Sequence, residues 1–370
     1  MPYPQFDRKK IRVKTLSMRE NKVNIEKDYV RLNQKSENYS ELFNIRVNEV
    51  IARIQNARNK NAPVMLTFGA HSIKNGLGPV IIKLMEQGWL THLATNGAGI
   101  IHDWEFAFLG ESSEDVRGNV ERGEFGIWQE TGYFINLAII VGAFEGKGYG
   151  ESVGSMVEKE GVEIPSEKKL RQIAENSDKN MLDQASAALD LLNTMKQFEI
   201  EPGWLKIPFP MKKYCVQAAA FKLGIPFTGH PMIGHDIIYT HPLNSCSAIG
   251  RTAQRDFLTF AHSVNRLENG VYMSVGSAVM SPMIFEKSLS MAQNLHIQHG
   301  KHIDNHYMLI VDLAKSEWDW QKNGEPPPSD PGYYLRYLKT FSRMGGTMNY
   351  LSADNRDFLL AIYHGLNDLS

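Results

Sequence analysis

The chain has 370 residues, of which 42% are hydrophobic and 22% charged, values ordinary for a soluble globular protein. Its formal net charge of −1 gives no general attraction to nucleic acid or to anionic membranes. The two cysteines, Cys215 and Cys246, form no CxxC pair, and no stretch resembles a signal peptide or approaches eighteen consecutive apolar residues. We therefore expect a cytoplasmic protein with neither a nucleic-acid nor a membrane partner.

Residues 1–38 are polar and rich in basic side chains, most densely between Arg8 and Lys14. We interpret this segment as a solvated arm, with a contact to nucleic acid or to another subunit as the alternative. Ser40 is a suitable cap for the amphipathic helix that follows. The predicted organisation is a polar arm of residues 1–38 and a single α/β domain of residues 39–370.

Two strand-turn-helix units follow. Val64–Phe68 is an apolar run that stops at Gly69, Ala70 and His71, and apolar residues then return at helical spacing up to Gly88. A second short strand, Thr91–Ala94, ends at the turn 96–99. Strands that alternate with helices predict a parallel sheet, in which ligands bind beyond the carboxyl ends of the strands. Both turns should therefore lie on the same rim.

The turn formed by Asn96, Gly97, Ala98 and Gly99 would point backbone N–H groups outward where a helix opens near Ile101. This arrangement predicts a cradle for an anion or a diphosphate, and an ordinary turn is the alternative. The glycine-rich segment 142–154 lacks the spacing of a phosphate-binding loop, so we predict a mobile loop there.

The remaining elements continue the alternation. Helices are expected over 133–141, 164–198, 212–223 and 252–267 and at the end of the chain. A further helix is expected to start at Ser112 or Ser113. Strands are expected over 225–228, 272–275, 307–311 and 350–354. The segment 229–241 contains several histidines and Asp236, all common metal ligands, but their spacing fits no compact metal-binding pattern. The histidines between 296 and 306 straddle an element boundary. We predict no metal site.

Five segments together resemble the deoxyhypusine synthase family in order and spacing over residues 60–365. They are GAHSIKNGL at 69–77, TNGAGIIHDWE at 95–105, GIPFTGHPMIGHDIIYTH at 224–241, GVYMSVGSAVMSP at 270–282 and NYLSADNRDFLLAI at 349–362. The resemblance implies a Rossmann-like fold, that is, an α/β parallel sheet with helices on both faces, together with NAD as cofactor and a homotetramer. It also implies that the cofactor is bound by Gly69, Ala70, His71, Asn96, Gly97, Ala98, Gly99, Gly276, Ser277 and Asp354.

In that family a hydride passes from spermidine to NAD, and an active-site lysine carries the aminobutyl group as an imine to an acceptor protein. Asp236 resembles the acidic residue that contacts the amine. The counted lysine position falls on Phe341, and Lys339 matches only after a two-residue shift. His102 and Pro231 stand where the family has acidic residues, and 280–282 replaces a Lys-His-His-type triplet. These departures predict that the chain is not an efficient deoxyhypusine synthase.

The resemblance therefore implies an NAD-dependent transferase or oxidoreductase acting on an amine, such as a polyamine, or on another small polar substrate. The predicted catalytic residues are Lys339, His102, His235 and Asp236, with histidines such as His71 as further acids or bases. The alternative is a non-catalytic or regulatory dinucleotide-binding homologue.

Overall fold

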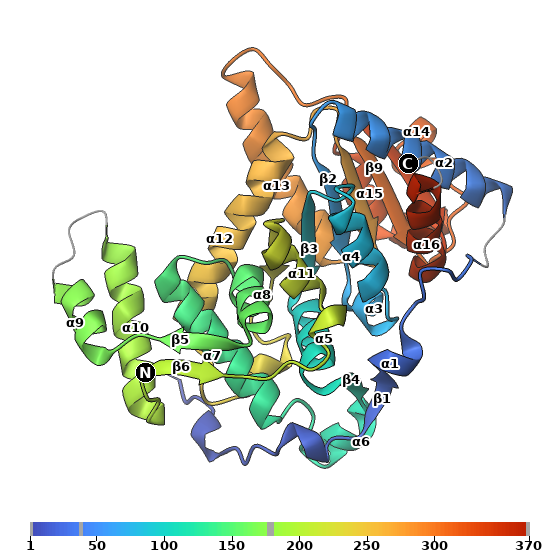
Figure 1. The fold of residues 1–370 in the computed structure, drawn as a ribbon. Helices are drawn as coiled ribbons and strands as arrows, with labels where there is room; N and C mark the ends of the chain where they lie inside the picture. Colours follow the sequence, from blue (N-terminus) through green and yellow to red (C-terminus); the bar gives the residue numbers. More distant parts are fainter. Residues whose placement is uncertain (1–2, 37–39, 176–180, 368–370) are drawn as a thin grey trace. The chain divides into compact units, whose positions relative to one another are not determined.

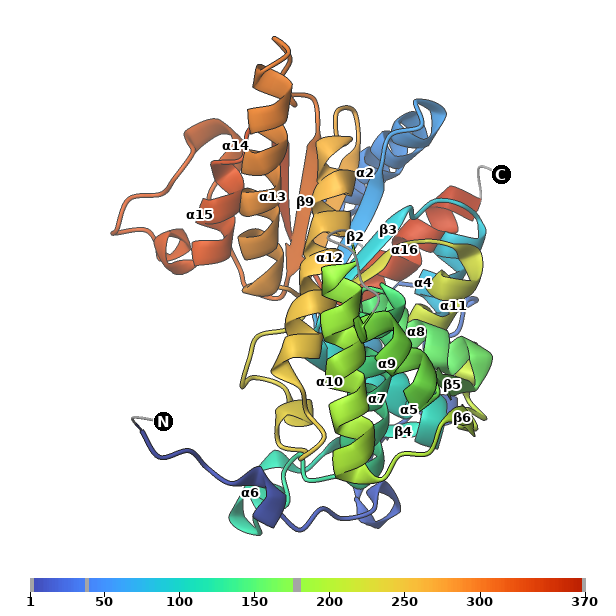
Figure 2. The ribbon, with the colours of Figure 1, turned by 90° about the vertical axis from the view of Figure 1, so that its left-hand side faces the viewer.

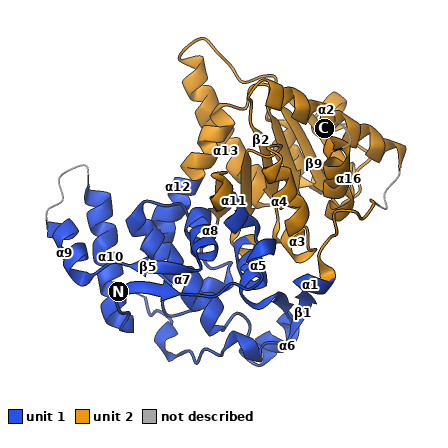
Figure 3. Ribbon diagram, in the orientation of Figure 1, with its two compact units in different colours: residues 1–27, 100–221, 231–256 blue, residues 28–99, 222–230, 257–370 orange. Residues whose placement is uncertain are grey.

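The computed structural model describes residues 3–36, 40–175 and 181–367, and the chain forms two compact units (Figures 1 and 3). Unit 1 comprises residues 1–27, 100–221 and 231–256, and unit 2 comprises residues 28–99, 222–230 and 257–370. Each unit is thus assembled from segments that are far apart in the sequence. The first segment of unit 1 ends at residue 27. The domain boundary at residue 38 and the single domain over residues 39–370 stay predictions.

Unit 2 contains a six-stranded sheet in the order β10-β9-β8-β2-β3-β7, and all of its strand pairs are parallel. The strands are β2 (Val64–Phe68), β3 (His92–Asn96), β7 (Phe227–His230), β8 (Val271–Val275), β9 (Tyr307–Asp312) and β10 (Thr347–Ser352). The chain proceeds from β2 through β3 to β7 on one side, then starts again at β8 beside β2 and proceeds through β9 to β10 on the other. This is the strand order of a Rossmann sheet, with a topological switch point between β2 and β8.

Helices cover both faces of this sheet, as Figures 1 and 2 show together. One face carries α2 (Glu41–Asn59), α4 (Gly78–Glu86) and α16 (Asn355–Asn367), and the other carries α12 (Cys246–Asn265), α13 (Met280–Ile297) and α15 (Arg336–Ser342). Short helices α3 (Ala70–Lys74) and α14 (Trp320–Asn323) complete the unit, and α11 (Val216–Leu223) includes residues of both units, as does α12. The predicted Rossmann-like α/β fold is confirmed. As predicted, the Ser40 side chain caps α2 by accepting a hydrogen bond from the Phe43 N–H group at 3.2 Å.

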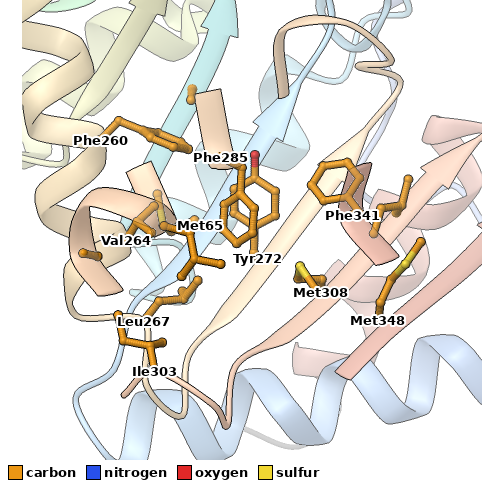
Figure 4. Close-up of a cluster of buried hydrophobic side chains, with 14 of the residues drawn as sticks. Met65, Phe260, Val264, Leu267, Tyr272, Phe285, Ile303, Met308, Phe341 and Met348 are labelled. Carbon is orange, nitrogen blue, oxygen red and sulfur yellow. The ribbon is translucent and has the colours of Figure 1, made fainter. Parts of the chain in front are cut away.

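A buried apolar cluster joins the sheet to α12, α13 and α15 (Figure 4). The ring of Tyr272 on β8 stacks on Phe285 of α13 with a centroid separation of 4.3 Å, and Phe341 of α15 lies 6.0 Å from both rings. All of these side chains are fully buried. Position 341, where the resemblance places a lysine nucleophile, is therefore a core position in this protein.

Unit 1 is mainly helical and contains two small antiparallel sheets. Its helices are α1 (Ile25–Asp28), α5 (Gly97–Leu109), α6 (Val116–Glu121), α7 (Gln129–Glu145), α8 (Tyr149–Lys159), α9 (Glu167–Glu175) and α10 (Leu182–Phe198), with the first residues of α5 and the last of α1 in unit 2. The strands are β1 (Asn21–Asn24), which pairs with β4 (Glu111–Glu114), and β5 (Gly161–Ile164), which pairs with β6 (Gly203–Lys206). Residues 176–180 of the predicted helix 164–198 lie outside the described residues.

The N-terminal segment packs against the rest of unit 1, which corrects its interpretation as a solvated arm. Strand β1 pairs with β4, and Leu16 is fully buried. The Arg19 guanidinium lies inside the unit and donates to both carboxylate oxygens of Glu105 at 2.8 and 2.7 Å. A run of basic residues does not reveal such a partner, because the partner lies 86 residues further along the chain.

Glycines account for two further corrections. Helix α7 continues through Gly142, where a Cβ atom would collide with Ser152 of α8, and it ends at Gly146, which has a φ of +82°. Gly142 thus permits close packing of two helices, whereas Gly146 is the residue that ends α7. The predicted mobile loop 142–154 is wrong, because α8 starts at Tyr149.

The helix start predicted at Ser112 or Ser113 is also wrong. Both residues belong to β4, and α6 begins later, with the Asp115 side chain accepting a hydrogen bond from the Gly118 N–H group at 3.0 Å. Strand β4 forms because β1 supplies its hydrogen-bonding partner. Within the part of the chain that the structure describes, no helix is long and apolar enough to cross a membrane.

Candidate functional site

The turns that follow β2 and β8 meet at the topological switch point of unit 2. The Gly69 N–H group donates to the carbonyl of Val275 at 3.1 Å, and a Cβ atom on Gly69 would collide with the carbonyl oxygen of Gly276. Gly276 is exposed and has a φ of +58°, which favours glycine. The structure therefore brings Gly69 and Gly276 together at the carboxyl edge of the sheet, where such folds bind their ligands.

The predicted turn 96–99 is already the first turn of α5, which starts at Gly97 and not near Ile101. The Asn96 side chain caps it by accepting a hydrogen bond from the Gly99 N–H group at 2.9 Å. A Cβ atom on Gly99 would collide with the Thr95 side chain, so this glycine allows the helix to approach β3. Gly97 and Ala98 remain as the backbone groups of the predicted cradle, at the positive end of a helix dipole.

Four further predicted cofactor residues surround these turns. Ala70 and His71 begin α3, with the His71 side chain exposed, and the buried Ser277 hydroxyl accepts a hydrogen bond from the Ser281 N–H group at 3.3 Å. Asp354 follows β10 and forms an ion pair with Arg356 at 3.0 Å. The hydrogen bond from Arg356 lowers the pKa of Asp354, so this carboxylate is ionised at neutral pH.

Asn355 connects the edge strand β10 to the turn after β2, and sequence reasoning missed it. Its amide group accepts a hydrogen bond from Asn75 at 2.9 Å and donates to the Ser72 hydroxyl at 3.4 Å. In the sheet order β10 is three strands away from β2, about 14 Å at the usual strand spacing of ~4.8 Å. Asn355 thus links Asp354 to the region of Gly69, a connection that local sequence does not reveal.

Lys339 lies on α15, and its ammonium group contacts two neighbouring side chains. Its ammonium group lies 2.5 Å from the Glu325 carboxylate and 3.6 Å from the centroid of the Tyr333 ring. A lysine that forms an imine must lose its proton, and both a carboxylate and an aromatic face stabilise the protonated form. These contacts are those of a structural lysine, and the nucleophile assignment stays a prediction.

Asp236 lies in unit 1 at the start of the 3₁₀ turn η4 (Ile237–Tyr239). Its Oδ2 atom is buried and has no hydrogen-bond partner among the described residues. Burial raises the pKa of Asp236 to about 7. A buried carboxyl group without a partner is costly to maintain, and such groups are concentrated at functional sites.

Two tyrosines accompany Asp236, and sequence reasoning missed both. The phenol oxygens of Tyr149 and Tyr239 are buried and likewise lack a partner in the described parts of the chain. Burial and the negative charge of Asp236 raise the pKa values of both phenols. Tyr239 follows Asp236 by three residues and could have been noticed, whereas Tyr149 comes from the segment predicted as a loop.

The two histidines predicted to be catalytic differ in their surroundings. The His235 side chain is exposed on the loop that precedes Asp236. The half-buried His102 lies on α5, and its Nδ1 atom is 2.7 Å from the Ser112 hydroxyl. The structure therefore holds His102 in one orientation, while nothing comparable orients His235 among the described residues.

His230 and His241, which flank Asp236 in the sequence, are buried and held by hydrogen bonds within the protein. Burial lowers the pKa of His230 to about 3 and that of His241 to about 4, and their Nε2 atoms lie 2.9 Å from Thr228 and 3.2 Å from Gln129. Over residues 3–36, 40–175 and 181–367, no group of three or more His, Cys, Asp or Glu side chains is arranged to hold a metal ion.

The strand order and the switch point define the class of this protein as α/β with a Rossmann-like sheet. No protein-family model matches the chain, and no curated protein matches it in sequence. Similar solved structures include a conserved putative LOR/SDH protein from Methanococcus maripaludis S2, which is 12% identical with a TM-score of 0.45 and covers 90% of this chain and 72% of its own.

Two further solved structures have names that describe ligands or an activity. The ternary complex of AgrE with ornithine and NAD+ is 14% identical with a TM-score of 0.43 and covers 90% of this chain, which in turn spans 34% of the AgrE chain. A putative deoxyhypusine synthase from Entamoeba histolytica is 10% identical with a TM-score of 0.36, over 89% of this chain and 90% of that one.

Proposed function

We propose that the protein is an NAD-dependent enzyme that acts on a small amine. The observation that carries the proposal is the switch point between β2 and β8, where the turns at Gly69 and Gly276 meet at the carboxyl edge of a sheet with Rossmann strand order. Dinucleotides bind at this position in sheets of this order. NAD accepts a hydride when it is bound in such a site.

The residues of this rim suit the parts of a dinucleotide. The N-terminus of α5, with the backbone groups of Gly97 and Ala98, offers N–H donors and positive potential to a diphosphate. Asp354, ionised because of its hydrogen bonds with Arg356, can accept a hydrogen bond from a ribose hydroxyl. The close approach of Gly69 to Gly276 leaves no side chain at the point where the two turns meet.

The amine is the substrate class that the Asp236 cluster in unit 1 favours. The buried Oδ2 atom of Asp236 and two buried phenol oxygens, none with a hydrogen-bond partner in the described structure, together offer several hydrogen-bond acceptors. A protonated amine supplies both the missing positive charge and the missing N–H donors. Amine binding should therefore lower the pKa of Asp236 and keep its carboxylate ionised.

We propose oxidoreductase chemistry in preference to imine transfer on a lysine. Phe341 occupies the counted lysine position inside the core, and Lys339 is paired with Glu325. An imine needs its nucleophile positioned to a fraction of an ångström and free of its proton. A protein that binds NAD at this edge of the sheet but oxidises no amine would instead be the alternative, a regulatory dinucleotide-binding protein.

The test starts with calorimetric titration of NAD into the wild type, Gly97→Val and Gly250→Val. The first variant places a branched side chain in the cradle, whereas Gly250 lies on α12 with nothing within 4 Å of an added Cβ atom. We expect binding to the wild type and to Gly250→Val and at least a tenfold loss for Gly97→Val. No heat with the wild type across the millimolar range would contradict the proposal.

Absorbance at the wavelength of NADH then tests for turnover with spermidine, putrescine and ornithine as probes. NADH formation with one of them that is lost in Asp236→Asn supports an amine-oxidising enzyme. NAD binding with neither turnover nor any effect of amines on the protein's thermal stability would favour the regulatory alternative.

A further inference from the structure

His102, Ser112 and Glu105 form a continuous hydrogen-bonded chain within unit 1. The His102 Nδ1 atom lies 2.7 Å from the Ser112 hydroxyl oxygen, and that hydroxyl lies 2.5 Å from Oε2 of Glu105. Ser112 is fully buried and Glu105 is 1% exposed. The direction of each hydrogen bond in this chain follows from the charge of Glu105.

Glu105 is held as a carboxylate. The Arg19 guanidinium donates to both of its oxygens, and the Thr131 hydroxyl donates to Oε1 at 3.0 Å. Burial acts to raise the pKa of Glu105, but the charge and hydrogen bonds of Arg19 outweigh it, so the pKa lies below its ordinary value. A carboxylate can only accept hydrogen bonds.

The Ser112 hydroxyl has a single proton, and Glu105 requires it. Ser112 must therefore accept in its other hydrogen bond, which makes Nδ1 of His102 the donor. We infer that Ser112 and Glu105 are positioning residues that hold the neutral His102 ring with its proton on Nδ1, so that Nε2 is the atom that accepts a proton. The partner of one ring nitrogen determines the tautomer in this way.

The role of His102 rests on the proposed function. Oxidation of an amine to an imine removes a hydride from carbon, for which the bound cofactor would supply the acceptor, and a proton from nitrogen, for which Nε2 of the neutral His102 ring is a suitable base. The resulting imidazolium donates through Nδ1 to Ser112, which already donates to Glu105. The positive charge is thereby stabilised by the Glu105 carboxylate, to which the ring is connected through the Ser112 hydroxyl.

The N-terminal segment supplies half of this arrangement. Strand β1 pairs with β4 so that Val23 lies opposite Ser112, and Arg19 comes just before β1. Arg19 keeps Glu105 ionised, and β1 fixes the strand that carries Ser112. The segment that resembles a polar arm in sequence is thus part of the His102 site.

Nuclear magnetic resonance of the 15N-labelled full chain tests this inference without NAD or substrate. Two-bond 1H–15N correlation spectra distinguish the two histidine tautomers, and the His102 signals are identified by their loss in His102→Gln. We expect the Nδ1–H tautomer in the wild type. The Nε2–H tautomer would overturn the inference even if every Ser112 variant failed to fold.

Three serine variants separate positioning from a general structural effect. Ser112→Ala removes the acceptor and should leave a mixture of tautomers, whereas Ser112→Thr keeps a hydroxyl and should restore the Nδ1–H form. Ser113→Ala is the matched control, because the neighbouring Ser113 hydroxyl is buried without a partner among the described residues. An unchanged tautomer in a folded Ser112→Ala variant would overturn the inference, and the proposed NAD site would be unaffected by that result.

Discussion

Replacing Arg19 by methionine should destabilise unit 1 strongly. The Arg19 and Glu105 side chains are each 1% exposed, and two hydrogen bonds of 2.8 and 2.7 Å join them. Removing one member of such a pair leaves the other charge buried without compensation, at a cost of about 3–5 kcal/mol. Domains have a total stability of about 5–15 kcal/mol, so the loss is a large part of the total.

Denaturant unfolding followed by tryptophan fluorescence measures the effect, with Lys22→Met as the control. Lys22 and Asp115 form a pair whose side chains are 60% and 54% exposed, so its loss should have little effect on stability. Combining Arg19→Met with Glu105→Leu should recover part of the stability, because Glu105 then no longer lies buried without its partner. The recovery should be partial, because Glu114, which is also buried and lies 3.9 Å from Arg19, loses its partner in both variants.

The destabilisation should also depend on pH. In the wild type the pKa of Glu105 is lower than its ordinary value of 4.5, so its contribution is present above pH 4.5 and disappears as pH falls through the folded pKa. Without Arg19, burial raises this pKa, and protonation relieves the penalty at low pH. The difference between the proteins should therefore shrink from pH 7 towards pH 4. A loss below 1 kcal/mol at pH 7, or one that is equal at both pH values, would refute the reasoning.

Three further predictions concern Asp236, Lys339 and the assembly state. Burial raises the pKa of Asp236 from 3.8 to about 7, so the wild type should lose stability as pH rises through this range; Asp236→Asn should be more stable at pH 8 by on the order of 1–3 kcal/mol and equal near pH 4 in thermal unfolding. Incubation of the wild type with NAD, labelled spermidine and an acceptor protein, followed by borohydride, should give no adduct on Lys339. A labelled adduct that forms in the wild type and is absent from Lys339→Ala would instead show that Lys339 is the nucleophile of a deoxyhypusine synthase reaction. Light scattering should show a homotetramer, and a monomer at all concentrations would contradict the assembly that the resemblance implies.

Local sequence was sufficient to predict much of unit 2. Val64–Phe68 was predicted to the residue as a strand, because an apolar run bounded by Gly69 has few other ways to bury its side chains. The alternation of strands with helices predicted a parallel sheet. The prediction that Ser40 caps α2 was also correct, because this hydrogen bond joins residues only three positions apart in the sequence. Because parallel strands end at the same edge of the sheet, these strands also predicted that the turns after β2 and β3 lie on one edge.

The structural role of each glycine depends on the residues that lie near it in the folded protein. The absence of a Cβ atom permits a left-handed turn, as at Gly146, and equally permits close packing, as at Gly142 against Ser152. A sequence shows the glycine but not the surface it faces. For this reason the end of α7 was misplaced and α8 was predicted as a loop.

Buried polar groups depend in the same way on distant segments. The charge of Glu105 depends on Arg19, and the cluster around Asp236 includes Tyr149, which precedes it by 87 positions in the printed sequence. The strand order also lies beyond local pattern, because alternation does not reveal on which side of β2 each later strand is added. The sequence by itself determined the six strands of the parallel sheet and the class of fold. The tertiary structure decided which charges are paired, which acid is left with an unpartnered oxygen, and where the two halves of the sheet meet.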